Sequence, residues 1–118
     1  MDGDVLRRLA MLIITEQRLI EYAKQHPEAA SSLLRWGALV RSAKWRNLAD
    51  TRRTFAHADP AGLCTVFNIK GNDYRLITRI DYGLQTVTLK HSLTHSEYDR
   101  GSWKKDWPLR LSRTKLTL

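Results

Sequence analysis

The chain has 118 residues, of which 42% are apolar and 27% are charged, a composition typical of one globular domain with one core. Its 20 Lys and Arg residues against 12 Asp and Glu residues give a net charge of +8 and an isoelectric point near 10.1. This imbalance predicts a polyanionic partner, most often nucleic acid, although an acidic protein partner fits equally well. The single cysteine, Cys64, excludes an internal disulfide and a thiolate metal cluster.

The ends of the chain show no targeting or membrane-spanning pattern. No apolar run approaches the roughly 18 residues of a membrane span, and residues 1–10 lack the apolar region of a signal peptide. We therefore expect a cytoplasmic protein with no membrane partner. The patterned sequence begins at Met11, so we interpret residues 1–10 as an N-terminal extension, residues 11–107 as the folded domain and residues 108–118 as a basic C-terminal tail.

The N-terminal half predicts one short strand and two helices. Leu12–Ile14 is an apolar run, rich in β-branched residues, that suits an extra strand of a sheet. Thr15 is placed to cap a helix over Glu16–Gln25. Pro27 ends this helix and opens a second one that runs to about residue 43. The apolar residues at helical spacing in the second helix are Leu33, Trp36 and Val40.

A basic segment follows the second helix. Between Arg35 and Arg53 the only acidic residue is Asp50, and the basic residues are Arg35, Arg41, Lys44, Arg46, Arg52 and Arg53. We predict that this segment contacts RNA phosphates, chiefly through Arg41, Lys44 and Arg46. The alternative is a solvated helix end and loop without a ligand.

Two β-rich runs then flank the dipeptide Gly71-Asn72, which suits the positive-φ positions of a tight hairpin turn. A loop over His57–Gly62 precedes the first run. The opposed pairs that such a turn predicts are Ile69–Tyr74, Asn68–Arg75, Phe67–Leu76, Val66–Ile77 and Thr65–Thr78. A third run, Thr86–His91, completes a three-stranded antiparallel meander.

Because side chains alternate between the faces of a strand, the meander has an apolar and a polar face. The apolar face carries Phe67, Ile69, Tyr74, Leu76, Val87 and Leu89. The polar face carries Asn68, Lys70, Arg75, Arg79, Thr88 and Lys90, with Val66 and Ile77 among them. Together with the helices this predicts an α+β fold whose second sheet face is cationic and open to a ligand. Cys64 is expected to be a small buried residue.

After the meander, Thr94 and Glu97 form a capping box that opens a short helix. His95 and Tyr98 are three residues apart in this helix and therefore project from the same side. Trp103 and Trp107 are four residues apart and are expected to dock the helix on the body of the protein.

A basic strand face beside a histidine and a tyrosine is suited to metal-free RNA cleavage. The 2′-hydroxyl attacks the adjacent phosphate once a base removes its proton, cations stabilise the phosphorane, and an acid protonates the leaving oxygen. The four histidines, His26, His57, His91 and His95, show no metal-ligand spacing, and no carboxylate cluster suits magnesium, so no metal ion or other cofactor is expected.

Two stretches of the chain resemble one family of known proteins. VFNIKGNDYRLITRIDY (Val66–Tyr82) and THSEYD (Thr94–Asp99) are similar to the HigB family of type II toxins, a branch of the RelE-like mRNA interferases. The opening MLIITEQRLIEYAKQHPEA also resembles that family, so that the similarity covers about Met11 to Trp107. Residues 1–10 and 108–118 depart from the family pattern.

The resemblance implies a compact RelE-like domain, with two N-terminal helices packed on a twisted antiparallel sheet. It implies a toxin that cuts mRNA during translation, in the ribosomal A site, and that a HigA-like antitoxin with a helix-turn-helix domain neutralises. Carried over by position, the nuclease residues are Lys70, Arg75, His95 and Tyr98, supported by Asn68, Arg79 and Asp99, and Lys90 is a further RNA contact.

Within that site we expect His95 to act as general acid or base and Arg75 and Lys70 to lie on the scissile phosphate. Tyr98 stacks on a base or shares the proton transfer. Three alternatives stay open. Stabilisation of the turn is an equal alternative for Asn68, and an ion pair or helix terminus suits Asp99 better than catalysis. For the chain as a whole, the alternative is a non-catalytic RNA- or ribosome-binding module.

Overall fold

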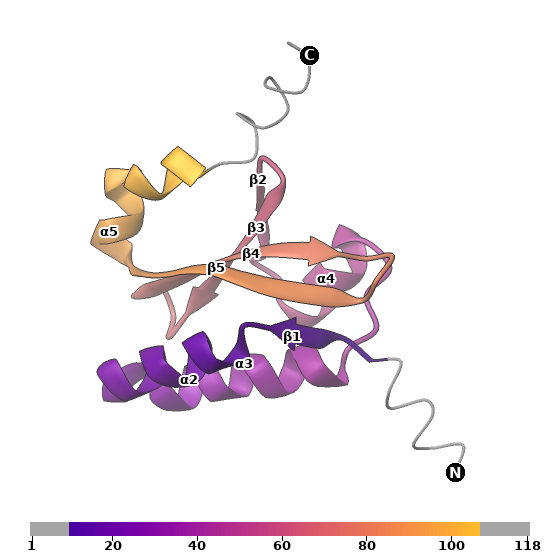
Figure 1. The fold of residues 1–118 in the computed structure, drawn as a ribbon, viewed down its shortest axis with the longest axis horizontal. Helices are drawn as coiled ribbons and strands as arrows, with labels where there is room; N and C mark the ends of the chain where they lie inside the picture. Colours follow the sequence, from indigo (N-terminus) through magenta and orange to yellow (C-terminus); the bar gives the residue numbers. More distant parts are fainter. Residues whose placement is uncertain (1–9, 107–118) are drawn as a thin grey trace.

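The computed structural model describes residues 10–106, which form an α+β structure as predicted (Figure 1). The strands are β1 (Leu12–Ile14), β2 (Asp59–Ala61), β3 (Cys64–Ile69), β4 (Tyr74–Asp81) and β5 (Thr86–Thr94). The α-helices of this region are α2 (Glu16–Gln25), α3 (Ala30–Ser42), α4 (Leu48–Thr54) and α5 (His95–Arg100). Two 3₁₀ turns, η1 (Pro27–Ala29) and η2 (Ser102–Asp106), complete the described elements. Two stretches lie outside the described residues. One is residues 1–9 of the expected N-terminal extension, and the other is residues 107–118, which comprise Trp107 and the expected tail.

One mixed sheet with the strand order β1-β5-β4-β3-β2 organises the fold. The predicted meander β3-β4-β5 is antiparallel, and all five predicted pairs of the β3–β4 hairpin are confirmed. Two features differ from the predicted antiparallel sheet and the loop before it. β1 pairs with β5 in parallel, and the segment predicted as a loop over His57–Gly62 contains the edge strand β2, where Pro60 is tolerated because an edge strand needs no second ladder.

Helices α2 and α3 lie on one face of the sheet (Figure 1). Their apolar stripes meet the predicted apolar strand face, and the main core contains Leu19, Leu33, Trp36, Val40, Phe67, Leu76, Val87 and Leu89, each at most 1% exposed. Helix α2 has the predicted bounds. Thr15 does precede it, but its side chain bonds the backbone of Leu89 on β5 and caps nothing, which corrects the predicted capping role.

Helix α4 occupies part of the basic segment, where the sequence predicted no helix after about residue 43. Its N-cap is Asn47, whose side-chain oxygen accepts a hydrogen bond from the backbone N–H of Asp50 over 2.9 Å. Asp50 in turn accepts from the backbone N–H of Arg46. Asn47 thus satisfies an N–H group that a helix start leaves unpaired, and Asp50 satisfies the N–H of the residue before the cap.

A bulge in β5 decides which side chains reach the second sheet face. Ile77 pairs with His91 and Thr78 pairs with Leu89, so that Lys90 has no opposed partner on β4. Because one extra residue inverts the alternation, Leu89 lies in the main core whereas Leu93 packs on the other face. None of the helices within residues 10–106 combines the length and the apolarity that a bilayer span needs.

Candidate functional site

The β3–β4 hairpin loop, Lys70–Asp73, positions the guanidinium of Arg75. Lys70 and Gly71 have positive φ angles of 53° and 65°, whereas the sequence predicted such angles for Gly71 and Asn72. Asn72 instead turns both its backbone oxygen and its side-chain oxygen toward Arg75, which donates to them over 3.0 and 2.6 Å. The loop is therefore folded around the Arg75 guanidinium.

Arg75 is only 8% exposed, which corrects the expectation that its guanidinium stands free on an open strand face. Besides Asn72, it donates to the backbone oxygen of Tyr74 over 3.2 Å and to Nδ1 of His95 over 3.1 Å. These four contacts leave one of the five guanidinium N–H groups without a partner among the described residues. The charge is thus held at a fixed place, as a preorganised electrostatic site requires.

His95 opens α5, and the predicted capping box fixes its position. The Thr94 hydroxyl accepts from the Glu97 backbone N–H, and the Glu97 carboxylate accepts from the Thr94 backbone N–H. Nε2 of His95 lies 3.0 Å from the Asp99 carboxylate. Asp99 therefore forms an ion pair or hydrogen bond within the helix, as the non-catalytic interpretation of this residue expected.

Tyr98 projects from the same side of α5 as His95, as predicted. The Arg75 guanidinium lies 5.3 Å from the centroid of its ring, within the range of a cation–π contact. The Tyr98 ring also contacts Trp103, whose ring is stacked on it with a centroid distance of 5.2 Å and an interplanar angle of 12°. Burial raises the pKa of the Tyr98 phenol above its ordinary value of 10.0, so its O–H is protonated at neutral pH.

The second sheet face is accordingly not an open cationic surface along its whole length, as the sequence suggested. Its middle is a small second core, in which Val66 and Ile77 pack with Cys64, Trp103 and part of Tyr98. Cys64 is buried, as predicted, and Trp103 docks α5 and η2 on the sheet. The sequence did not show what covers Val66 and Ile77 on this face. In the structure, Tyr98 of α5 and Trp103 of η2 cover them.

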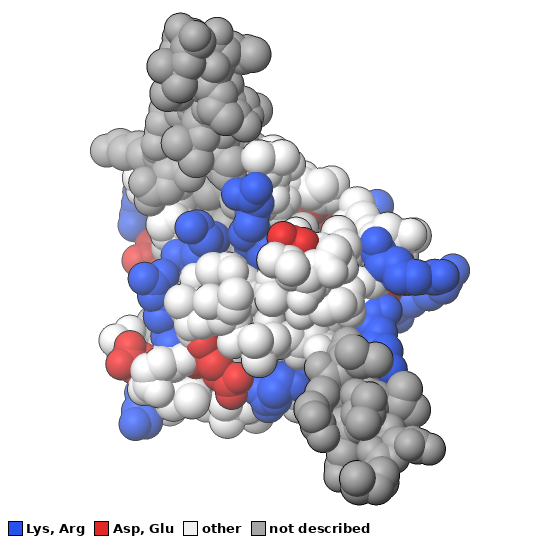
Figure 2. Space-filling view, turned by 45° about the vertical axis from the view of Figure 1, so that its right-hand side comes forward, with Lys and Arg blue, Asp and Glu red and all other residues white. Residues whose placement is uncertain are grey.

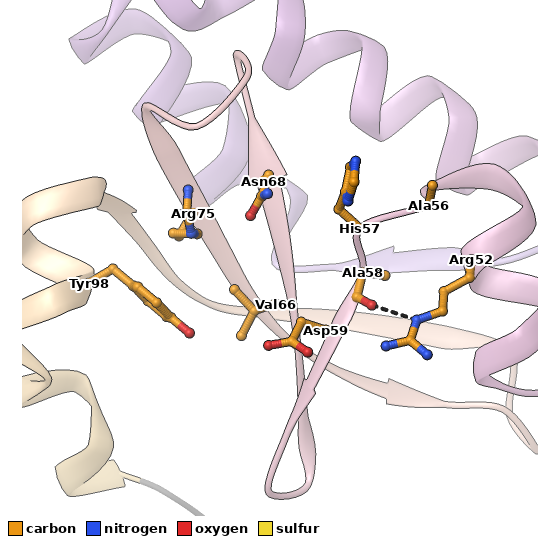
Figure 3. A pocket seen from close by; sticks show the side chains of 9 residues that line it. All are labelled: Arg52, Ala56, His57, Ala58, Asp59, Val66, Asn68, Arg75 and Tyr98. Atoms are coloured by element: carbon orange, nitrogen blue, oxygen red, sulfur yellow. Dashed lines mark hydrogen bonds between the residues drawn. The ribbon is translucent and has the colours of Figure 1, made fainter.

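A pocket of about 560 Å³ opens beside this second core (Figure 3). Nine residues line it: Arg52, Ala56, His57, Ala58, Asp59, Val66, Asn68, Arg75 and Tyr98. Figure 3 shows Arg75 and Tyr98 on one side and His57, Ala58 and Arg52 on the other, with Asn68 and Val66 between them. The Nε of Arg52 donates to the backbone oxygen of Ala58 over 2.9 Å, which holds the second wall together.

The structure brings only part of the predicted site into this pocket. Arg75, Tyr98 and Asn68 line it, and His95 stands behind Arg75. Lys70 does not line it. Its exposed ammonium lies 3.3 Å from the Asp73 carboxylate, and the residue borders a second pocket of about 120 Å³ between α3 and the hairpin, to which Asn68 also contributes. Arg79 and Lys90 are exposed and line neither pocket.

Two residues of the second wall, His57 and Asp59, were not predicted as site residues, and Arg52 was predicted only as one cation of the basic segment. His57 and Asp59 lie in the segment that was interpreted as a plain loop, and no motif spacing connects them to Arg75. They reach the pocket because β2 pairs with β3, so that Asp59 is opposed to Val66. Within the described residues, no three His, Cys, Asp or Glu side chains are grouped in a way that could hold a metal ion.

The six cations of the basic segment are exposed, and three of them have acidic partners. Arg41 contacts Glu16 at 2.9 Å, and Arg46 and Arg53 contact the two oxygens of Asp50 at 2.9 and 3.2 Å. Lys44 is exposed and makes no side-chain contact of this kind with a described residue. In the face that Figure 2 presents, the Lys and Arg side chains lie around the margin of an uncharged centre.

Comparison with known proteins gives a family match. The family model of HigB_toxin, described as the RelE-like toxic component of a toxin–antitoxin system, matches residues 29–101, more than half of the chain. The mRNA interferase toxin HigB of Escherichia coli strain K12 is 24% identical over 92 residues, which cover 75% of this chain and 88% of that protein. The mRNA interferases HigB of Escherichia coli O157:H7 and Shigella flexneri match with the same figures. The chain therefore belongs to the HigB family of RelE-like toxins.

Proposed function

We propose that this chain is an endoribonuclease that cleaves mRNA by attack of the 2′-hydroxyl on the adjacent phosphate, without a metal ion. As a member of its family it is the toxic component of a toxin–antitoxin system, and it therefore has an antitoxin partner. Its relatives bear the name mRNA interferase. The observation that carries the proposal is the fixed guanidinium of Arg75 beside the Tyr98 ring at the wall of an open pocket.

Arg75 would stabilise the substrate phosphate mainly through its positive charge, because protein groups already accept hydrogen bonds from four of its N–H groups. Its contacts to Asn72, Tyr74 and His95 hold the guanidinium in place before any substrate arrives. A cation fixed in advance stabilises the doubly charged phosphorane without paying for reorganisation during the reaction. Tyr98 presents an aromatic face and a phenolic O–H to the same pocket, where it suits a base stack or a proton transfer.

We further propose that the substrate is mRNA on the ribosome, in the A site, and that cleavage depends on translation in the cytoplasm. The net charge of +8 supports association with ribosomal RNA. Exposed cations that would contact phosphates are Lys44, Arg41, Arg46, Lys70, Arg79 and Lys90. The antitoxin is proposed to be HigA-like, with a helix-turn-helix domain.

The test uses the full chain, purified away from its antitoxin, with programmed ribosomes and a defined mRNA. We expect cleavage that yields a 5′-hydroxyl and a 2′,3′-cyclic or 3′-phosphate. We also expect cleavage to persist in EDTA, in an assay in which the magnesium that the ribosomes themselves require is controlled separately. In cells, expression of the chain alone should arrest growth and the co-expressed antitoxin should restore it. Stable ribosome association without any cleavage would replace this proposal by the alternative of a non-catalytic ribosome-binding module.

A further inference from the structure

The proposed reaction needs a group that accepts the proton of the 2′-hydroxyl, and the predicted residue is poorly placed for it. Arg75 donates to Nδ1 of His95, and Asp99 lies at hydrogen-bond distance from Nε2. Both ring nitrogens are therefore occupied by protein groups. His95 also does not line the 560 Å³ pocket, which it approaches only through Arg75.

Tyr98 cannot accept this proton at neutral pH either. Its phenol is protonated there, because the ordinary pKa of 10.0 already lies above neutral pH and burial raises this pKa further. A protonated phenol donates a proton and does not remove one. Tyr98 is thus suited to the other transfer, in which the leaving oxygen gains a proton.

His57 has the properties that these two residues lack. It lies in the loop between α4 and β2 and lines the pocket on the side away from Tyr98 (Figure 3). Its side chain is exposed, and it makes no hydrogen bond or ion pair with any described residue. An imidazole can exchange a proton near neutral pH, so an accessible ring in the pocket is a suitable base.

Resting on the proposed function, we infer that His57 is the general base of RNA cleavage, with Tyr98 as the general acid and His95 as a positioning residue for Arg75. His57 removes the 2′-hydroxyl proton while the O2′–P bond forms. The P–O5′ bond breaks, and the Tyr98 phenol gives its proton to O5′. The products are a 2′,3′-cyclic phosphate and a 5′-hydroxyl, and solvent returns the proton from the imidazolium to the phenolate.

The arrangement of the pocket agrees with the stereochemistry of this step. In a displacement at phosphorus the attacking and leaving oxygens lie roughly in line, on opposite sides of the phosphorus atom. His57 and Tyr98 lie on opposite walls, and Asn68 and Val66 separate them (Figure 3). A phosphate between the two walls would have the Arg75 charge beside it.

Single-turnover cleavage of ribosome-bound mRNA tests this assignment through three variants. His57→Ala should lose on the order of 10²–10⁴-fold in rate, with unchanged ribosome affinity, and added imidazole should restore part of the rate. His57→Gln should be equally slow and should lose the decline of the rate toward acid pH that an imidazole base causes. His26→Gln, which removes an imidazole outside the pocket, should behave as wild type.

The possible failures point to different errors. Wild-type cleavage by His57→Ala would overturn the assignment of the base but leave the proposed function standing. A slow His57→Ala that keeps the acid decline and ignores imidazole would also overturn it, since His57 would then only shape the pocket. A wild-type chain that cuts no ribosome-bound mRNA would overturn the proposed function together with this inference.

Discussion

The guanidinium of Arg75 donates a hydrogen bond to Nδ1 of His95 over 3.1 Å. Because an arginine does not lose its proton in a protein, Nδ1 has to be the acceptor, and the proton of the neutral ring lies on Nε2, facing Asp99. The pair therefore links the hairpin loop, the start of α5 and the pocket wall. Its two residues come from the two separate sequence stretches that resemble the toxin family.

Removing Arg75 should affect both folding and catalysis. Arg75→Ala leaves the oxygens of Asn72 and Nδ1 of His95 without their donor, and a buried polar group without a partner costs about 1–3 kcal/mol. We expect a lower free energy of unfolding in urea, a retained fold, and a loss of cleavage on the order of 10²–10³-fold. Arg75→Lys should keep the charge but not the four contacts, so it should recover little. An Arg75→Ala variant that is as stable and as active as wild type would falsify the role of this cluster.

The cleavage rate of a His95 variant should depend on whether the new side chain still accepts a hydrogen bond from Arg75. His95→Asn places an amide oxygen near the position of Nδ1, so we expect it to retain most of the cleavage rate. His95→Ala removes the acceptor and should reduce the rate at least tenfold, with a folded protein by circular dichroism. The measurement is the single-turnover rate of both variants. Equal, severe losses in His95→Asn and His95→Ala would show that His95 itself transfers a proton.

Ribosome association should depend most on the cations that have no acidic partner. Arg35 and Lys44 are exposed and make no ion pair with a described residue, so their replacement by Glu removes charge without breaking a contact. We expect weaker co-sedimentation with ribosomes and a smaller dependence of affinity on salt. Arg46→Glu should also lower stability, because it sets a second carboxylate beside Asp50. Unchanged association of the Arg35→Glu, Lys44→Glu double variant would place the ribosome contact elsewhere.

The start of α4 should lose stability in acid. The side chain of Arg46, then its backbone N–H, hold the pKa of the Asp50 carboxyl below its ordinary value of 3.8. Because the pKa of Asp50 is lower in the folded than in the unfolded protein, its ionised carboxylate stabilises the fold fully above pH 3.8. This stabilisation is lost as the pH falls through the pKa that Asp50 has in the folded protein. Urea unfolding between pH 7 and pH 2 should show a loss that is smaller in Asp50→Asn. Parallel pH curves for the two proteins would rule out this contribution.

The sequence by itself determined the local structure, because local structure depends on neighbours along the chain. Apolar spacing predicted α2 and the stripe of α3. The loop length around Gly71 fixed the register of the β3–β4 hairpin, since one slip would turn Phe67 and Leu76 away from the core. Thr94 and Glu97 predicted the start of α5, because a capping box spans only four consecutive residues. The family resemblance also lay in contiguous motifs, and the family match confirmed it.

Only the tertiary structure decided what each site residue contacts. The polar strand face appeared open, but α5 returns over it, so that Arg75 is buried and Val66 belongs to a second core. The bulge at Lys90, which no pattern marked, turns Leu93 toward that core. β2 is too short to be recognised by alternation, yet its pairing with β3 carries His57 and Asp59 to the pocket. Contacts between residues distant in sequence depend on how the elements pack, and the packing is a property of the whole chain.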